Sequence, residues 1–173
     1  GTLPLSLEED DAYLGSVSYT ITDPMESVES LEFSAYYNYV HHRMNNEHKP
    51  TRGMMRVVFP LDARTFGGRL QANVPSFFGG RLTVGGDIYR LEREGTNHVS
   101  FLKGPKAGMH MFFDSWPDAH VLDGGLFGEY AYQIFPRFRL VVGTRVDFVD
   151  TGANPDEKAR MGFNRFYGPG ASD

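Results

Sequence analysis

Hydrophobic and polar residues alternate along six stretches of the chain, with the two-residue period of a β-strand that has one apolar and one polar face. In the stretch LEFSAYYNY (31–39), Leu, Phe, Ala and Tyr occupy the odd positions, and Glu, Ser, Tyr and Asn stand between them. No helical spacing competes within these stretches. The pattern predicts strands near residues 12–22, 31–44, 57–74, 81–93, 123–134 and 138–150.

The connections between these strands alternate between short and long. Short turns fall in TDPMESVES, PSFFGG and FPR, whereas long external loops are expected near 45–56, 95–122 and 151–173. Short turns at one end of a sheet and long loops at the other are typical of outer-membrane barrels. We therefore expect an all-β fold, an antiparallel up-and-down transmembrane β-barrel segment, in which residues 1–173 form a single partial barrel region.

Six strands are too few to enclose a hydrated lumen, because the smallest outer-membrane barrels have about eight. The chain is therefore predicted to supply about six strands of a larger barrel, with the plug domain of such a barrel absent from this chain.

The hydropathy of the chain excludes membrane-spanning helices but leaves membrane-spanning strands open. Mean hydropathy is −0.37, and no run approaches the roughly 18 apolar residues that a helical span needs. The polar face of the expected strands carries Arg, Asp, Asn and Gln with almost no Lys, which favours a hydrated lumen over a solvent-exposed surface. A soluble β-sandwich binding domain without metal alternates in the same way and stays open as an alternative.

Charge and motif content exclude two classes of function. The net charge is −5 and no basic stripe is present, so nucleic acid is not an expected partner. No Ser-His-Asp or Cys-His set stands at a suggestive spacing, so the protein is not expected to be an enzyme. The acidic run EEDD (8–11) is expected to be a solvated loop.

His42 and Met44 are the strongest candidate metal ligands. Residues two apart on a strand share a face and lie about 6.5–7 Å apart, and the even positions of 31–44 form the polar face. Imidazole and thioether together suit a copper ion, especially Cu(I). His41 falls on the opposite face and is expected to be an interfacial residue. The alternative for His42 and Met44 is a rim histidine and a methionine that packs beneath a loop.

The two long loops hold a possible secondary set of metal-capturing side chains. A relay of thioether and imidazole groups could pass copper to His42 and Met44, and the alternative is that these methionines fill apolar gaps beneath the loops. The set consists of Met54, Met55, Met109, His110 and Met111.

Three segments resemble the barrel of a TonB-dependent outer-membrane receptor: SLEFSAYYNYVHHRMNN, ARTFGGRLQANV and LFGEYAYQIFPRFRLVVGTRVDF. The first is the sharpest. A strand that runs through Tyr-Tyr-Asn into His-x-Met-x-Asn, then a Met-rich loop before Asp-x-Arg-Thr-x-Gly-Gly-Arg, is similar to the TonB-dependent copper receptors. That resemblance implies a barrel of about 22 strands closed by an N-terminal plug. It also implies a copper site that combines plug ligands with a His-x-Met pair, here His42 and Met44.

The resemblance further implies a place and partners for the protein. It would lie in the bacterial outer membrane, bind and take up a metal ion or metal complex as cargo, and contact outer-membrane lipid. It would meet the TonB complex through a plug that is not present in this chain. Copper is the expected cargo, and an iron-siderophore complex carried by the same class of receptor is the alternative.

Overall fold

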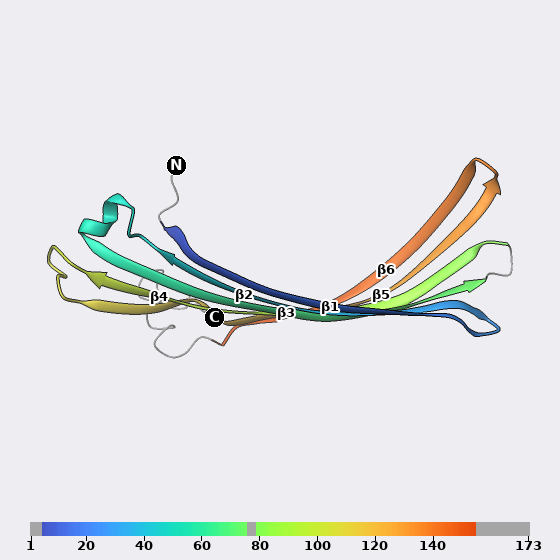
Figure 1. Cartoon of the computed structure of the whole chain (residues 1–173), viewed down its shortest axis with the longest axis horizontal. Helices are drawn as coiled ribbons and strands as arrows, with labels where there is room; N and C mark the ends of the chain where they lie inside the picture. Colours follow the sequence, from blue (N-terminus) through green and yellow to red (C-terminus); the bar gives the residue numbers. More distant parts are fainter. Residues whose placement is uncertain (1–4, 76–78, 155–173) are drawn as a thin grey trace.

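A computed structural model describes residues 5–75 and 79–154 and places them in one six-stranded antiparallel sheet (Figure 1). Each strand pairs with its neighbours in sequence, in the order β1-β2-β3-β4-β5-β6. A short 3₁₀ helix, Pro50–Gly53, lies between β2 and β3. The strands are β1 (Ser6–Met25), β2 (Val28–Asn45), β3 (Met55–Pro75), β4 (Arg81–Phe101), β5 (His110–Phe135) and β6 (Phe138–Gly152).

The up-and-down antiparallel fold predicted from the alternation is confirmed. The described strands form a single layer and not the two packed sheets of a β-sandwich. The connections from β1 to β2, β3 to β4 and β5 to β6 lie at one end, here called the turn end. The connections from β2 to β3 and from β4 to β5 lie at the other end, here called the loop end.

The strands at the loop end are longer than the sequence pattern indicated. The expected loop at 95–122 is wrong over most of its length, since β4 continues to Phe101 and β5 starts at His110. The reason is a pair of register shifts in the β4–β5 ladder, around Gly95. Extra residues on β5, near Pro117 and the positive-φ residue Asp118, break the two-residue alternation while the ladder continues on both sides.

The acidic run at 8–11 was also assigned wrongly, because it lies in β1 and pairs with β2. Glu9, Asp10 and Asp11 pair with Arg43, His42 and His41, so acidic and basic side chains face each other across the two strands. Glu8 lies at the register shift next to this pairing. Opposite charges directly across an antiparallel pair stabilise it, which explains how four acidic residues fit within a strand.

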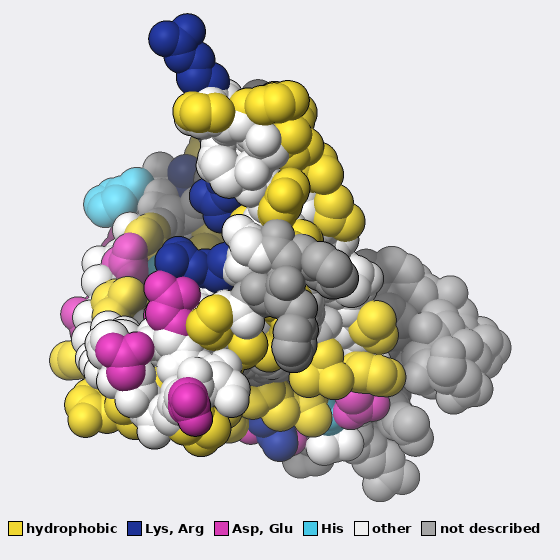
Figure 2. Space-filling view, turned by 90° about the vertical axis from the view of Figure 1, so that its right-hand side faces the viewer, with side chains coloured by type: hydrophobic (Ala, Val, Ile, Leu, Met, Phe, Trp, Pro, Cys, Tyr) yellow, Lys and Arg dark blue, Asp and Glu magenta, His cyan; other side chains and the backbone are white. Residues whose placement is uncertain are grey.

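The two faces of the sheet differ in chemistry along most of its length. One face carries Phe33, Leu70 and Leu126 in register and is called the apolar face. The other carries Glu32 and Gln71 and is called the polar face. Seen from the turn end, hydrophobic side chains run down the right-hand edge of the upper part of the sheet, and dark-blue Lys and Arg side chains lie to their left (Figure 2).

The apolar face has no layer above it in the described part of the chain. Large side chains on it stand open to the surroundings, for example Leu126 at 65% and Phe148 at 67% exposure. Only Phe59, Val99 and Ala131 are buried hydrophobic residues among the residues that the structure describes. Within the same ranges, no helix is long and apolar enough to cross a membrane.

The polar face is held together by side-chain hydrogen bonds that cross strands. Arg145 in β6 donates two hydrogen bonds to the carboxylate of Asp87 in β4, at 2.7 and 2.8 Å, and a third to Asp147 at 2.6 Å. Strand β5 lies between β4 and β6, so the arginine must pass over it. It does so at Gly125, where an added Cβ would lie 2.6 Å from Asp147 Oδ1 and 2.7 Å from the Arg145 guanidinium carbon.

We predict that Gly125→Ala displaces Arg145 and breaks its paired hydrogen bonds to Asp87. Overpacking of this kind costs about 1–3 kcal/mol, so the urea midpoint of the complete protein in lipid vesicles should fall. Gly128→Ala is the matched control in the same strand, because an added Cβ there would meet only Val84 Cγ1, at 4.0 Å. Equal midpoints for the two variants would contradict the crossing of Arg145 over Gly125.

Candidate metal site

His42 and Met44 lie in β2 at the loop end, two positions apart on the polar face. His42 stands between Asp10 in β1 and Leu61 in β3, and Met44 stands between Leu7 and Phe59 in the same two strands. Strand β2 keeps one continuous register with β3 over its whole paired length, so no bulge turns either side chain to the other face. One imidazole and one thioether are therefore presented side by side to the same space.

His41 faces the opposite side and already has a partner. Its Nδ1 lies 2.9 Å from Asp62 Oδ1, and the Tyr39 hydroxyl donates to the same carboxylate oxygen at 2.5 Å. Tyr39 is at the end of the apolar part of that face, and His41 and Asp62 lie beyond it. The hydrogen bond to Asp62 raises the pKa of His41 above its ordinary value, which favours the protonated ring. His41 does not belong with His42 and Met44, because it lies on the other face of the sheet.

The acidic run in β1 supplies polar neighbours that the sequence pattern missed. Asp10 Oδ1 lies 3.0 Å from His42 Nδ1 on the polar face. Glu8 accepts a hydrogen bond from the Asn45 side chain at 2.6 Å and lies 3.6 Å from Arg43 Nε. Only the cross-strand register brings these acids to the end of β2. The sequence does contain a signal that could have indicated the pairing, because the acidic run EEDD in one strand is complementary to the basic run HHR in the next.

The expected secondary capture set divides into three groups. Met55 and Met111 lie on the polar face with Met44, because Met111 pairs with Val99, Val99 pairs with Val57, and Val57 and Met55 share the face of Phe59. The remaining three members lie elsewhere: His110 is on the opposite face within 2.9 Å of Ser100 Oγ, and Met54 and Met109 are exposed at 62% and 48%.

These side chains do not form a ready-made metal cluster. Across residues 5–75 and 79–154, no three His, Cys, Asp or Glu side chains converge so that they could hold a metal ion. Met55 lies in β3, several residues along the strand from Phe59, which pairs with Met44. Met111 lies in β5, and strands β3 and β4 stand between β5 and β2. The polar face at the loop end thus offers one His–Met pair and further methionines spaced along the same surface.

Asn46 fixes the loop that follows the His–Met pair, and sequence reasoning gave it no role. Its side chain is 1% exposed and makes three hydrogen bonds. The amide nitrogen donates to Thr51 Oγ1 at 3.1 Å and to the Met55 carbonyl at 2.8 Å, and the amide oxygen accepts from the Val57 backbone N–H at 2.8 Å. Asn46 therefore links the end of β2 to the start of β3 by hydrogen bonds, which fixes the position of the neighbouring Met44 along the strand.

We predict that Asn46→Ala loosens the loop at 46–54 without unfolding the sheet. The change leaves buried polar groups on Met55 and Val57 without partners, at a cost of about 1–3 kcal/mol. Amide hydrogen exchange should become faster at Val57 and Lys49. His48→Ala, which alters an exposed residue of the same loop, is the control and should leave exchange unchanged. Unaltered protection in Asn46→Ala would show that the loop is held by other contacts.

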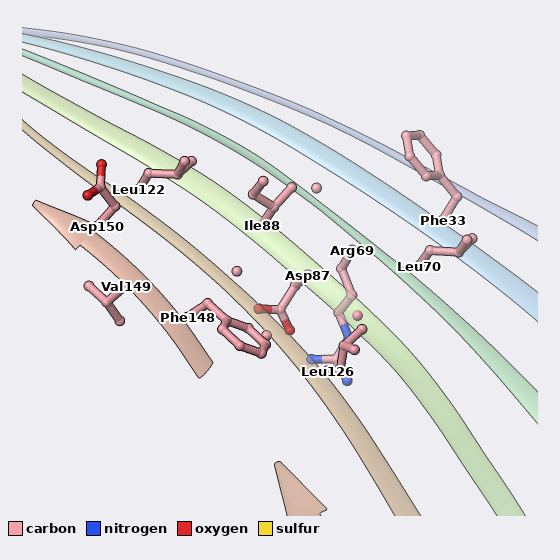
Figure 3. A pocket seen from close by; sticks show the side chains of 14 residues that line it. Phe33, Arg69, Leu70, Asp87, Ile88, Leu122, Leu126, Phe148, Val149 and Asp150 are labelled. Atoms are coloured by element: carbon pink, nitrogen blue, oxygen red, sulfur yellow. The ribbon is translucent and has the colours of Figure 1, made fainter. Parts of the chain in front are cut away.

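A cavity of about 700 Å³ lies on the sheet away from the His–Met pair (Figure 3). Phe33 and Leu70 lie at one end of it and Phe148 and Val149 at the other, with Ile88 between them. The lining is largely apolar and includes glycines such as Gly86, where the missing side chains leave a hollow in the apolar face. Its carboxylates are Asp87, which accepts hydrogen bonds from Arg145, and Asp150, and it holds no imidazole or thioether, so we do not assign the copper site there.

Comparisons with known proteins give no family, and the comparison with solved structures shows the fold alone. No protein-family model matches the chain, and no curated protein matches it. Among solved structures 29 chains match. One is "Copper transporter OprC", with a TM-score of 0.70 and 22% sequence identity, over 88% of this chain and 26% of that chain. The sheet is similar to part of a transporter barrel. This chain spans about a quarter of the length of that transporter.

Proposed function

We propose that the chain is part of the barrel wall of a bacterial outer-membrane receptor of the TonB-dependent class, and that the cargo of this receptor is copper. The observation that carries the proposal is the placement of His42 and Met44 on one face, at the loop end of a sheet similar to part of a copper transporter. The protein would bind its cargo and take it up, and would not act as an enzyme.

The open apolar face supports a location in a membrane. A single-layer sheet with a continuous apolar surface marks a membrane or protein contact, since soluble monomers rarely leave such a patch exposed. Along β2 the apolar face runs over residues 31–39, which is nine residues, and a transmembrane strand needs about 9–11. Tyr37 and Tyr39 close this stretch, and charged Asp62 and Arg64 lie beyond or beside them. An aromatic edge between apolar and charged zones is typical of a membrane interface.

The polar face then becomes the wall of the lumen, and copper is the cargo that its ligands suit. A neutral imidazole and a thioether form a soft pair that favours copper over Ca²⁺ or Mg²⁺. Two ligands do not complete a site, so further ligands would come from a plug, which would also contact the TonB complex. Outer-membrane lipid would cover the apolar face.

The methionines around the pair would act as capture positions for the same ion. Met55 and Met111 share the lumen face with Met44, and Met54 and Met109 are exposed in the connections, each just before the first residue of a strand. His110 faces away from this surface, so we assign it no role in the path to His42.

We predict that His42→Ala and Met44→Ala each weaken Cu(I) binding to the complete protein by at least about tenfold. Loss of a direct ligand should cost no less than loss of a residue that orients one, which is worth about 10–100-fold. His41→Ala, on the opposite face, and Met25→Ala, exposed at the turn end, are controls that should bind as the parent does. Binding can be measured by competition with a Cu(I) chelator of known affinity.

Parent-like affinity in both His42→Ala and Met44→Ala would contradict the copper site. A receptor of the same class with an iron-siderophore or other cargo would then be the better description.

We predict that Val17→Arg destabilises the protein far more than Leu14→Arg. Both residues are exposed in β1, at 58% and 75%, but Val17 is on the apolar face and Leu14 is on the polar face. An arginine that faces lipid at mid-membrane costs about 2–4 kcal/mol, whereas one in a hydrated lumen costs little. Unfolding in urea from lipid vesicles measures the difference, and equal stabilities for the two variants would argue against a lipid-facing apolar side.

A further inference from the structure

His42 is held between a carboxylate and an apolar side chain. Asp10 lies directly across the β1–β2 pair from His42, and its Oδ1 is 3.0 Å from His42 Nδ1. Leu61 lies on the other side in β3, and the next paired residue in β4 is Gly95, which has no side chain. Asp10 is thus the acidic group that faces the ring among these cross-strand neighbours.

The two nitrogens of the His42 ring are in different surroundings. Nδ1 is buried, although the side chain as a whole is 33% exposed. The contact from Nδ1 to Asp10 is short but lacks the angles of a hydrogen bond. The Asp10 side chain is 51% exposed, so its carboxylate has room to rotate and straighten the contact.

A carboxylate beside Nδ1 determines which nitrogen carries the proton. An ionised carboxylate only accepts hydrogen bonds, so a neutral imidazole beside it must place its N–H on Nδ1. The lone pair is then on Nε2, the nitrogen left to bind a metal. Carboxylates that face the second nitrogen of a metal-binding histidine fix the orientation of the ring and make it a stronger ligand.

We propose that Asp10 is a positioning residue, which holds His42 in the Nδ1–H tautomer and directs Nε2 into the space shared with Met44. The consequence for copper rests on the proposed function, but the orientation of the ring can be tested without metal. Asp10 does not touch the cargo and acts only through His42.

Asp11 provides a matched control from the same acidic run. It is paired with His41 on the opposite face, so its carboxylate does not meet the His42 ring. Replacing Asp11 removes the same charge from the adjacent position of the same strand and leaves the Asp10 contact in place.

The experiment uses the complete metal-free protein labelled with ¹⁵N-histidine, with the signals of His42 identified from their loss in His42→Ala. Ring nitrogen shifts of the neutral imidazole distinguish the two tautomers. We expect the Nδ1–H form in the parent and in Asp11→Asn. Asp10→Asn can donate an amide N–H to Nδ1, so the tautomer should reverse to Nε2–H. Asp10→Ala should give a mixture of the two forms.

A copper titration of the same variants provides the second measurement. Asp10→Asn should weaken Cu(I) binding by about 10–100-fold, and Asp11→Asn should not change it. Circular dichroism confirms that each variant is folded.

The outcomes separate the two proposals. If the tautomer of His42 is the same in the parent, Asp10→Asn and Asp10→Ala, the positioning role of Asp10 is wrong, even where His42→Ala loses copper. If the tautomer reverses in Asp10→Asn while His42→Ala still binds copper as the parent does, Asp10 orients the ring and the copper function fails.

Discussion

A sheet with no second layer cannot bury either of its faces against itself, and this constraint governs the rest of the molecule. The described strands pair their backbone groups along one continuous ladder, in which β1 and β6 are the two edge strands. Their apolar side chains find no core, because large residues such as Leu126 and Phe148 stay open on one face. The free energy of burial that folds an ordinary domain must therefore come from whatever covers that face. Under the proposed function a lipid bilayer covers this face, since a bilayer accepts apolar side chains.

The polar face carries charged side chains, and these must be ordered without a protein layer above them. Arg145 reaches over Gly125 to Asp87, so strands β4 and β6 are joined across β5. Near the loop end of this face, the carboxylate of Asp10 in β1 lies 3.0 Å from His42 Nδ1 in the neighbouring strand β2. The surface beside His42 and Met44 is thus ordered by charge pairs, and Asn46 fixes the loop next to it.

Sequence reasoning succeeded where alternation was unbroken and failed where it was interrupted. It found six strands and their antiparallel order, and it separated His41 from His42 because neighbouring residues of a strand must face opposite sides. It began the fifth strand too late, since the extra residues on β5 opposite Gly95 shift the pattern by whole residues while the hydrogen bonds continue. It placed the acidic run in a loop, because four charges in a row give no alternation to detect.

The sequence by itself determined the two faces, because a strand repeats every two residues and each side chain's face follows from its position alone. It therefore placed His42 and Met44 together. Only the tertiary structure decided which residues stand opposite them, namely Asp10, Leu7, Leu61 and Phe59. The physical reason is that the register between strands depends on turns and bulges, and the residues of one strand do not by themselves indicate where those turns and bulges lie. The same holds for Asn46, whose three partners come from the far side of its loop.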